Sequence, residues 1–441
     1  MDELSNFVHR LIDTIPDGAL KIEDARNVIR QINEFLYTNY EGIGQTRALE
    51  QKFDYLSDFH KYWEEHHKEI LNCEIDNVKC EQVADALHNI YVLTSGRAFE
   101  SVWDKCNLDS DEICKVRFLT ANQDFNGSND FSKLARIYRS DPSIFDIENI
   151  AEKPEEFVVK LGYSNRAQND KRNNYALKIA EFLLGHETEP FGLIDKFHND
   201  IYALRQAILN CYGAGYGNKK TDMFLRDMVV LDIWHNVKGF DKIDVASDVN
   251  TIKVALRTGI LKTAIPLVSS FLDIFCHQYS YIDEMNALAW RKVWEVWEEK
   301  YPAESISSPC LMDYFVYNVV GKQFCKESLA VFKGDNCRHV FRWHSARNKT
   351  CQVCYMQHVR NMKAHVTQKL MPCADEEGYI AIHETAFAKS MAPLTIDACP
   401  FQSICRDSIY LQPPKSISIL GQTGWTSAYA KKGQGGGGLM A

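Results

Sequence analysis

Apolar residues recur at helical spacing along most of the chain. Between residues 22 and 36, and again between 174 and 184, they fall on one face while polar and charged residues occupy the others. Few stretches between residues 150 and 300 alternate apolar with polar positions, as a half-buried strand would. This periodicity predicts a mainly α protein with an all-α region in its middle.

A glycine-rich turn interrupts the helical pattern between two long runs. The helix predicted over residues 201–209 leads into the sequence Gly-Ala-Gly-Tyr-Gly at residues 213–217, and a second helical run follows at once. Further along, Ser247 and Asp248 precede a run that ends near Gly259, which is the arrangement of a capped helix start and a glycine stop. We therefore expect a helix-hairpin-helix, followed by a capped helix.

Composition divides the chain into four parts. We expect an N-terminal helical domain at residues 1–150, within which residues 118–150 are rich in Asn, Asp, Ser and Gly and are predicted to form a loop. A helical core at residues 151–305 contains the hairpin. Cysteine and basic residues gather in residues 306–410, and residues 411–441 turn to Pro, Ser and Gly, which predicts a flexible tail.

The bulk composition is that of an ordinary globular protein. The 441 residues are 45% hydrophobic and 25% charged, and no apolar run is long enough to predict a membrane span. The N-terminus mixes acidic residues into its apolar positions, unlike a secretory signal, so the fourteen cysteines favour a reducing, cytoplasmic compartment. The net charge of −9 argues against a generally basic coat but allows a local basic face.

The glycine-rich hairpin is a candidate phosphate site. Backbone N–H groups of the turn and the positive end of the following helix would converge on one anion. Gly213, Gly215 and Gly217 would let a DNA backbone approach closely, and Lys220 would add positive charge. A purely structural turn is the alternative. A Walker-type loop does not fit, because no apolar strand precedes the turn and its glycine spacing differs.

Two segments together resemble the helix-hairpin-helix DNA glycosylases, which include endonuclease III and the 8-oxoguanine glycosylases. Residues 215–222 read Gly-Tyr-Gly-Asn-Lys-Lys-Thr-Asp, where that family has Gly-Val-Gly-x-Lys-x-Ala-Asp/Asn. Residues 247–258 fit the segment that carries the family's catalytic aspartate, with Asp248 at its position and Asn250 where His is usual. The spacing from Lys219 to Asp248 is closest to that of the archaeal 8-oxoguanine glycosylases.

The resemblance covers residues 155–300 and has two departures. Tyr216 replaces a small apolar residue, and no Leu-Pro pair precedes the hairpin. What it implies is an enzyme that flips a modified or damaged base out of double-stranded DNA and cleaves its N-glycosidic bond. Asp248 would stabilise the sugar cation, and Lys219 would be the Schiff-base nucleophile of an enzyme that also has lyase activity, because the positive end of a helix favours the uncharged amine.

Other interpretations of these residues stay open. Lys219 would contact phosphate only, or Lys220 would take its role, and Asp248 would be a plain N-cap. A non-catalytic DNA-binding protein that keeps the hairpin for docking is the alternative to an enzyme. As a glycosylase, the protein is expected to be a monomer associated with the nucleoid. The segments outside the core leave room for a specialised role, such as removing a bulky modified base from bacteriophage DNA.

The cysteine-rich segment resembles part of a metal site. Cys399 and Cys405 have the Cys-x5-Cys spacing that closes the iron–sulfur motif of endonuclease III and the adenine glycosylases, with a proline after the first cysteine. Ile396 stands where a further cysteine is expected, so Cys351 and Cys354 are predicted to complete a [4Fe–4S] site, with Cys373 as a substitute. Zinc is the alternative cofactor, with four candidate ligands: Cys337, His339, Cys351 and Cys354. Reduced core cysteines are the third interpretation.

A basic span lies beside these cysteines. Residues 336–374 contain no Asp or Glu, and aromatic residues interleave with the basic ones. We expect Arg338, Arg342 and Arg347 to contact DNA phosphates. A basic surface patch without a partner is the alternative.

Overall fold

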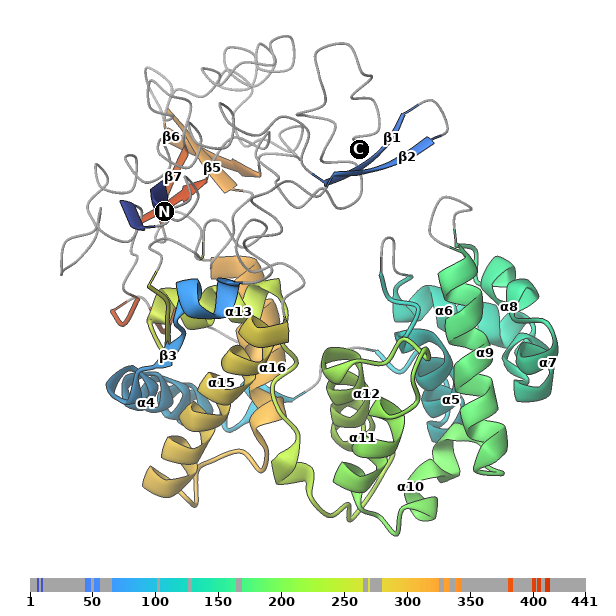
Figure 1. Ribbon diagram of the computed structural model, residues 1–441. Coiled ribbons are helices and arrows are strands. Elements are labelled where there is room, and N and C mark those ends of the chain that lie inside the picture. The colour runs from blue at the N-terminus through green and yellow to red at the C-terminus, as the bar shows by residue number, and fades with distance from the viewer. Residues whose placement is uncertain are drawn as a thin grey trace. The chain divides into compact units, whose positions relative to one another are not determined.

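A computed structural model gives the fold (Figure 1). The chain divides into two compact units: residues 91–248 with 300–315, and residues 1–90 with 249–299 and 316–441. The described residues are mainly helical, which confirms the predicted class. They are residues 6–7, 9–10, 44–48, 51–55, 66–100, 104–125, 129–163, 169–264, 269, 280–324, 329–333, 338–342, 380–383, 399–401, 403–405 and 409–412.

The unit of residues 91–248 and 300–315 carries the hairpin and consists of helices. Its α-helices are α5 (Ser110–Ala121), α6 (Phe131–Ser140), α7 (Ile147–Glu152), α8 (Pro154–Lys160), α9 (Asn169–Gly185), α10 (Leu193–Lys196), α11 (Ile201–Leu209), α12 (Asn218–Val230) and α16 (Met312–Tyr314). Its 3-10 helices are η1 (Arg97–Phe99), η2 (Pro142–Phe145), η3 (Pro190–Gly192), η4 (Phe240–Lys242) and η6 (Pro309–Leu311). The domain boundary expected at residue 150 lies inside this unit, within α7.

The loop predicted over residues 118–150 is wrong. This stretch holds the end of α5, all of α6 and η2, and most of α7. Its aspartates cap helices: the Asp130 side chain accepts a hydrogen bond from the Lys133 N–H, and the Asp146 side chain accepts one from the Asn149 N–H. Because the same residue types favour loops and N-caps, the composition alone indicated the wrong structure.

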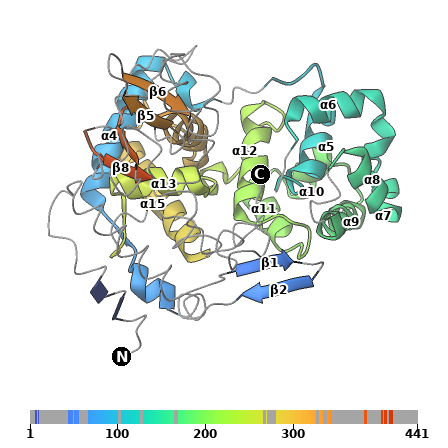
Figure 2. The ribbon, with the colours of Figure 1, turned by 90° about the horizontal axis from the view of Figure 1, so that it is seen from above.

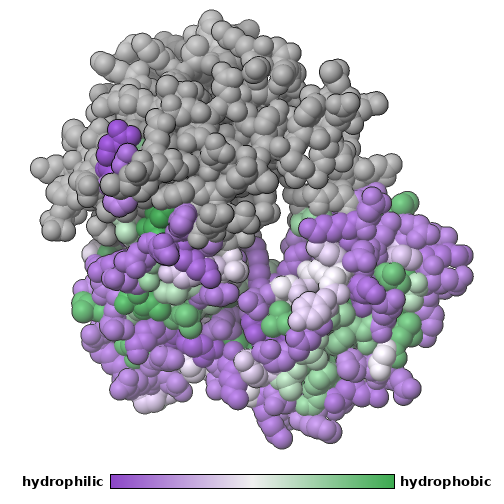
Figure 3. Space-filling view, in the orientation of Figure 1, coloured by the Kyte–Doolittle hydropathy of each residue, from purple (hydrophilic) through white to green (hydrophobic). Residues whose placement is uncertain are grey.

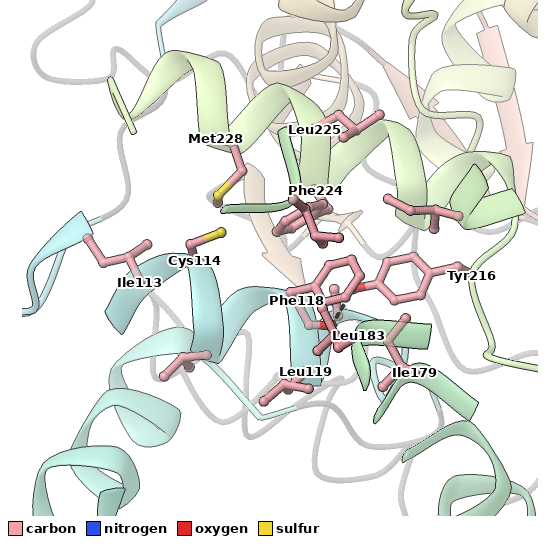
Figure 4. Packing of buried hydrophobic residues seen from close by; sticks show 14 of the residues in the cluster. Ile113, Cys114, Phe118, Leu119, Ile179, Leu183, Tyr216, Phe224, Leu225 and Met228 are labelled. Atoms are coloured by element: carbon pink, nitrogen blue, oxygen red, sulfur yellow. Dashed lines mark hydrogen bonds between the residues drawn. The ribbon is translucent and has the colours of Figure 1, made fainter. Parts of the chain in front are cut away.

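The core of this unit brings α5, α9, α11 and α12 together around aromatic residues (Figure 4). The ring centroid of Phe118 on α5 lies 5.0 Å from that of Phe224 on α12 and 5.5 Å from that of Tyr216 in the hairpin. Ile179 and Leu183 of α9 are fully buried in the same cluster. The hairpin therefore packs directly against the core of this unit through Tyr216.

The other unit contains helices and short antiparallel strand pairs. Its helices are most of α4 (Asn77–Thr94), α13 (Val249–Thr258), α15 (Ser280–Lys300) and the π-helix η7 (Phe315–Phe324). The strand pairs, one of which is the β1–β2 hairpin seen in Figure 2, are β1 (Gly44–Ala48) with β2 (Gln51–Tyr55), β3 (Glu74–Ile75) with β4 (Leu261–Lys262), β5 (Leu329–Lys333) with β6 (Arg338–Arg342), and β7 (Ile380–His383) with β8 (Ile409–Gln412).

Helix α13 begins where the sequence predicts, and α15 packs against it. Trp290 and Trp297 of α15 are buried, and the Trp290 indole N–H donates to the Thr251 carbonyl of α13 at 3.4 Å. Helix α13 ends at Thr258, and the next residue, Gly259, has the φ of +81° that is typical of a glycine stop. The predicted start and glycine stop of this helix are therefore confirmed, and its cap stays a prediction.

The surface agrees with the globular composition. On the face shown in Figure 3, the described residues are mostly hydrophilic, and apolar side chains form scattered patches. Each helix in the described part of the chain is too short or too polar to cross a lipid bilayer.

Candidate functional site

The hairpin between α11 and α12 adopts a conformation that needs glycine at two positions. Gly213 and Gly215 have φ of +82° and +76°, in the left-handed region that side chains disfavour. A Cβ atom on Gly215 would lie 2.3 Å from the ring of Tyr175 on α9. Gly217 is extended, and a Cβ atom there would meet open space. Gly217 is thus the glycine of this hairpin that leaves room for a ligand at the start of α12.

Tyr216 anchors the hairpin in the core. Its ring is buried, and its hydroxyl donates to the Phe118 carbonyl at the end of α5 (Figure 4). Burial raises the pKa of this hydroxyl above its usual value. The amide of Asn122 also donates to the Ala214 carbonyl at 2.9 Å. The tyrosine that departs from the glycosylase pattern is therefore a packing residue of this fold.

The two neighbouring lysines have different surroundings. Lys219 is exposed in the first turn of α12. The Lys220 ammonium donates to the Asn122 carbonyl at 2.8 Å and lies 5.1 Å from the ring centroid of Phe125. Burial is the main cause that lowers the pKa of Lys220 to about 8, and nearby positive charges add to it. Lys220 therefore loses its proton more readily than an ordinary lysine, whereas Lys219 is the amine that an external ligand can reach.

Asp222, the last residue of the glycosylase-like hairpin pattern, has a structural partner. Its carboxylate is buried and accepts two hydrogen bonds from Arg205 of α11, from Nε at 2.5 Å and from Nη2 at 2.9 Å. Arg205 also donates to the Asn218 side chain at 3.1 Å. This bidentate pair fixes α12 against α11 and so maintains the hairpin.

Asp248 lies directly before α13 and is half-buried. It is preceded by a buried segment, in which Ile243, Val245 and Ala246 are each at most 4% exposed. Helix α13 starts at Val249, so Asp248 occupies the N-cap position that the sequence predicts. The same position would suit a carboxylate that faces a ligand.

Asp313, which the sequence pattern did not single out, is a buried carboxyl group on α16. It pairs with Arg226 of α12, and burial raises its pKa to about 6. Asp248 and Asp227 raise this pKa further, whereas Arg226 and Lys219 lower it. The charges of Lys219 and Asp248 thus both contribute to the pKa of one buried carboxyl group.

A second feature that sequence reasoning missed is an aromatic and cationic surface beside the hairpin. Tyr212 is 84% exposed, which is unusual for a large aromatic side chain. The ammonium of Lys171 lies 5.7 Å from the ring centroids of both Phe125 and Tyr175. The guanidinium of Arg172, which is fully buried and so lies beneath this surface, is 4.0 Å from the Phe125 centroid. Only exposure distinguishes Tyr212 from a core tyrosine, so no pattern in the sequence could have identified it.

The predicted basic contacts fall largely outside the described part. Arg338 and Arg342 are the ends of β6, where they pair with Lys333 and Leu329 of β5, and nothing is described of their side chains. Arg347 lies outside the described residues. Their contact with DNA therefore stays a prediction.

The metal site also stays a prediction. Cys399 and Cys405 are half-buried, and the Cys405 N–H donates to the carbonyl of buried Phe401 at 2.9 Å. Cys351 and Cys354, like the other ligands of the zinc alternative, lie outside the described residues or have undescribed side chains. Within the described residues, no group of three or more His, Cys, Asp or Glu could hold a metal ion.

Neither a protein-family model nor a curated protein matches this chain.

Proposed function

We propose that the protein is a DNA glycosylase that excises a modified base from double-stranded DNA. The observation that carries the proposal is the helix-hairpin-helix of α11 and α12, with exposed Lys219 in the first turn of α12 and with Asp248 directly before α13. A nucleophile and a carboxylate near a phosphate-binding turn are the groups that this chemistry needs.

The hairpin supports the binding of a DNA backbone. Helix α12 has 13 residues, and its first N–H groups follow Gly217, where there is open space. These groups and the helix dipole attract an anion. Exposed Tyr212 and Lys219 stand on either side of the turn in sequence, so a bound strand would meet an aromatic ring and a positive charge.

The reaction follows from these groups. The bond between C1′ of the sugar and the base nitrogen breaks, the base leaves with the bonding electrons, and it takes a proton from solvent. The carboxylate of Asp248 stabilises the positive charge that develops on the sugar. The amine of Lys219, after losing a proton, attacks C1′ and forms a Schiff base with the opened sugar, which then permits strand cleavage by elimination. With water as the nucleophile instead, the products are free base and an abasic site.

The test is base release from a panel of duplexes. Each duplex carries one modified base, including 8-oxoguanine, uracil and glucosylated cytosine, and alkali cleaves the strand wherever a base has been lost. Glucosylated cytosine stands for modified bacteriophage DNA and tests a role in defence. We expect the wild type to act on at least one duplex and Asp248→Asn to be slower by roughly a hundredfold or more. The enzyme proposal fails if the wild type releases no base from any member.

A non-catalytic DNA-binding protein is the second candidate. The observation that favours it is the exposure of Lys219, which suits a phosphate contact, while the amine with a lowered pKa belongs to Lys220. Such a protein would bind a duplex with a tetrahydrofuran abasic-site analogue, would release no base, and would form no covalent product with borohydride. Binding that depends on Lys219 without any chemistry would establish this candidate.

A further inference from the structure

We propose that residues 308–313 form a positioning bracket, which holds the segment leading to Asp248 at a fixed place relative to the face of α12 that carries Lys219, with Asp313 as its key positioning residue. The proposal rests on the glycosylase function proposed above and adds a device that places the catalytic pair. It is carried by contacts at the two ends of the bracket, all within the unit of residues 91–248 and 300–315.

One end of the bracket holds the segment before Asp248. The hydroxyl of Ser308, which is fully buried, donates to the Phe240 carbonyl at 2.7 Å and lies 3.2 Å from the Ile243 carbonyl oxygen. The N–H of Cys310 donates to the same Ile243 carbonyl at 3.2 Å. Asp248 follows Ile243 by five residues, of which Val245 and Ala246 are buried. The segment leading to Asp248 is therefore held by hydrogen bonds at Phe240 and Ile243 and by burial at Val245 and Ala246.

The other end of the bracket holds α12. The Asp313 carboxylate pairs with the Arg226 guanidinium. Arg226 also donates to Asp227 Oδ1 from Nη2 at 2.7 Å, and Arg117 of α5 pairs with the other oxygen of Asp227 at 2.7 Å. All four side chains are less than a fifth exposed. Buried charges in such a network are costly to leave without partners, so the contact between α16 and α12 is strongly specified.

Helix geometry connects this end to Lys219. Arg226 follows Lys219 by seven residues, which is nearly two full turns, so both side chains leave the same face of α12 about 10 Å apart along its axis. The bracket thus attaches to the face that bears Lys219, while Lys220 and Asp227, also seven residues apart, define a neighbouring face towards α5.

Asp313 also responds to the catalytic pair electrostatically. The charged groups that act on it are Arg226, Asp227, Asp248 and Lys219, and it acts in turn on buried Cys310. Its pKa of about 6 lies near neutrality. Protonation of Asp313 would weaken its pair with Arg226, so the bracket is expected to loosen as the pH falls through about 6.

The test uses reductive trapping, which does not require the base to be known. Full-length protein is mixed with a duplex that contains an abasic site, and sodium borohydride captures the Schiff base with Lys219. We expect Asp313→Asn to trap about tenfold more slowly than the wild type at pH 7.5, because small displacements of catalytic groups have large effects on rate. Protonation of the attacking amine slows trapping in acid in every variant, and we expect the wild-type rate to show an additional fall below pH 6 that is missing in Asp313→Asn.

Two further variants separate positioning from stability. Asp222→Asn breaks a comparably buried Asp–Arg pair on α12 and should lower stability while leaving the pH profile of trapping unchanged. Ser308→Ala keeps all charges but removes the hydrogen bond at the other end of the bracket. It should slow trapping without changing its pH dependence. This variant keeps the bracket testable if Asp313→Asn fails to fold.

The outcomes distinguish the bracket from the function on which it rests. If the wild type traps and folded Asp313→Asn and Ser308→Ala trap at the same rate and with the same pH profile, the bracket is rejected and the glycosylase proposal stands. The bracket is also rejected if Asp222→Asn loses the additional fall in trapping rate below pH 6 to the same extent as Asp313→Asn. Weakening any buried ion pair on α12 would then have the same effect on the rate. If the wild type itself traps nothing, the Schiff-base role of Lys219 fails, and the bracket fails with it.

Discussion

The backbone of Gly215 lies so close to the ring of Tyr175 that a Cβ atom would stand 2.3 Å from it. Gly217, two residues on, has open space at the same position. The two glycines of one short motif thus serve different purposes: Gly215 lets the hairpin pack on α9, and Gly217 leaves the start of α12 accessible.

This difference predicts that two alanine substitutions will have unequal effects on stability. Gly215→Ala should lower the free energy of unfolding by about 2–4 kcal/mol, because it combines overpacking with a positive φ. Gly217→Ala should change stability by less than about 1 kcal/mol, because its φ of −101° suits alanine. Urea denaturation measures both.

The DNA affinities of the same variants test whether the start of α12 binds a phosphate. Gly217→Ala should weaken binding to duplex DNA, because its methyl group occupies the space that a phosphate would enter. Fluorescence anisotropy with a labelled duplex measures this. Unchanged affinity in Gly217→Ala would mean that the start of α12 is not the phosphate site.

Substitutions of Lys219 and Lys220 should have different effects on the covalent product of a trapping experiment. Lys219→Gln is expected to abolish the covalent product with an abasic duplex, because its exposed amine is the one that reaches the sugar. Lys220→Gln is expected to keep the product while lowering stability, since the amine bonds the Asn122 carbonyl. Peptide mass spectrometry identifies the trapped residue. A product attached to Lys220 would transfer the nucleophile to that residue.

Burial of Lys220 also predicts a pH dependence of stability. Its pKa is about 8 in the folded protein against 10.5 in its ordinary surroundings, so between these values the unfolded chain binds more protons than the folded one. The burial penalty on the charged amine is present below pH 8 and is lost as the pH rises to 10.5. The free energy of unfolding of the wild type should therefore increase relative to Lys220→Met over this interval. A constant difference between the two denaturation curves would show that the amine is well solvated.

The exposure of Tyr212 predicts that its side chain contributes to DNA binding but not to the free energy of unfolding. Because its side chain is 84% exposed, Tyr212→Ala should leave the free energy of unfolding within about 0.5 kcal/mol of the wild type. The same change should weaken binding to duplex DNA several-fold, and Tyr212→Phe should keep most of the affinity if the ring stacks on the nucleic acid. Val159→Ala, which removes another exposed side chain of the same unit, serves as the control. Equal affinity of all three variants and the wild type would exclude Tyr212 from the interface.

The cysteine-rich segment predicts a bound metal. Purified protein should contain either iron with thiolate-to-iron absorption bands or zinc without them, and metal analysis distinguishes the two. Cys399→Ser and Cys405→Ser should each lower the metal content. If protein purified in the absence of metal chelators contains neither metal, Cys399 and Cys405 are ordinary half-buried thiols.

Local features of the fold were predictable because local physics sets them. The helix over residues 201–209, the hairpin and the helix that stops at Gly259 follow from apolar period and glycine placement, and the structure has all three. Helices α6 and α7 were missed because their Asp caps resemble loop residues.

The parts of the site that depend on long-range contacts were not predictable. The pair of Arg226 and Asp313 joins residues 87 positions apart, and no periodicity connects them. The different surroundings of Lys219 and Lys220 depend on the end of α5, about a hundred residues earlier in the chain. The hairpin motif therefore identified both lysines as candidates, but only the folded chain shows that Lys220 is the more buried of the two.

The decisive measurement of glycosylase activity is single-turnover release of free base from the panel of modified duplexes, with the released base identified by mass spectrometry. We expect the wild type to free a base from at least one duplex and Asp248→Asn, at equal DNA affinity, to do so roughly a hundredfold more slowly. A wild type that binds every duplex and frees no base from any of them would contradict this expectation.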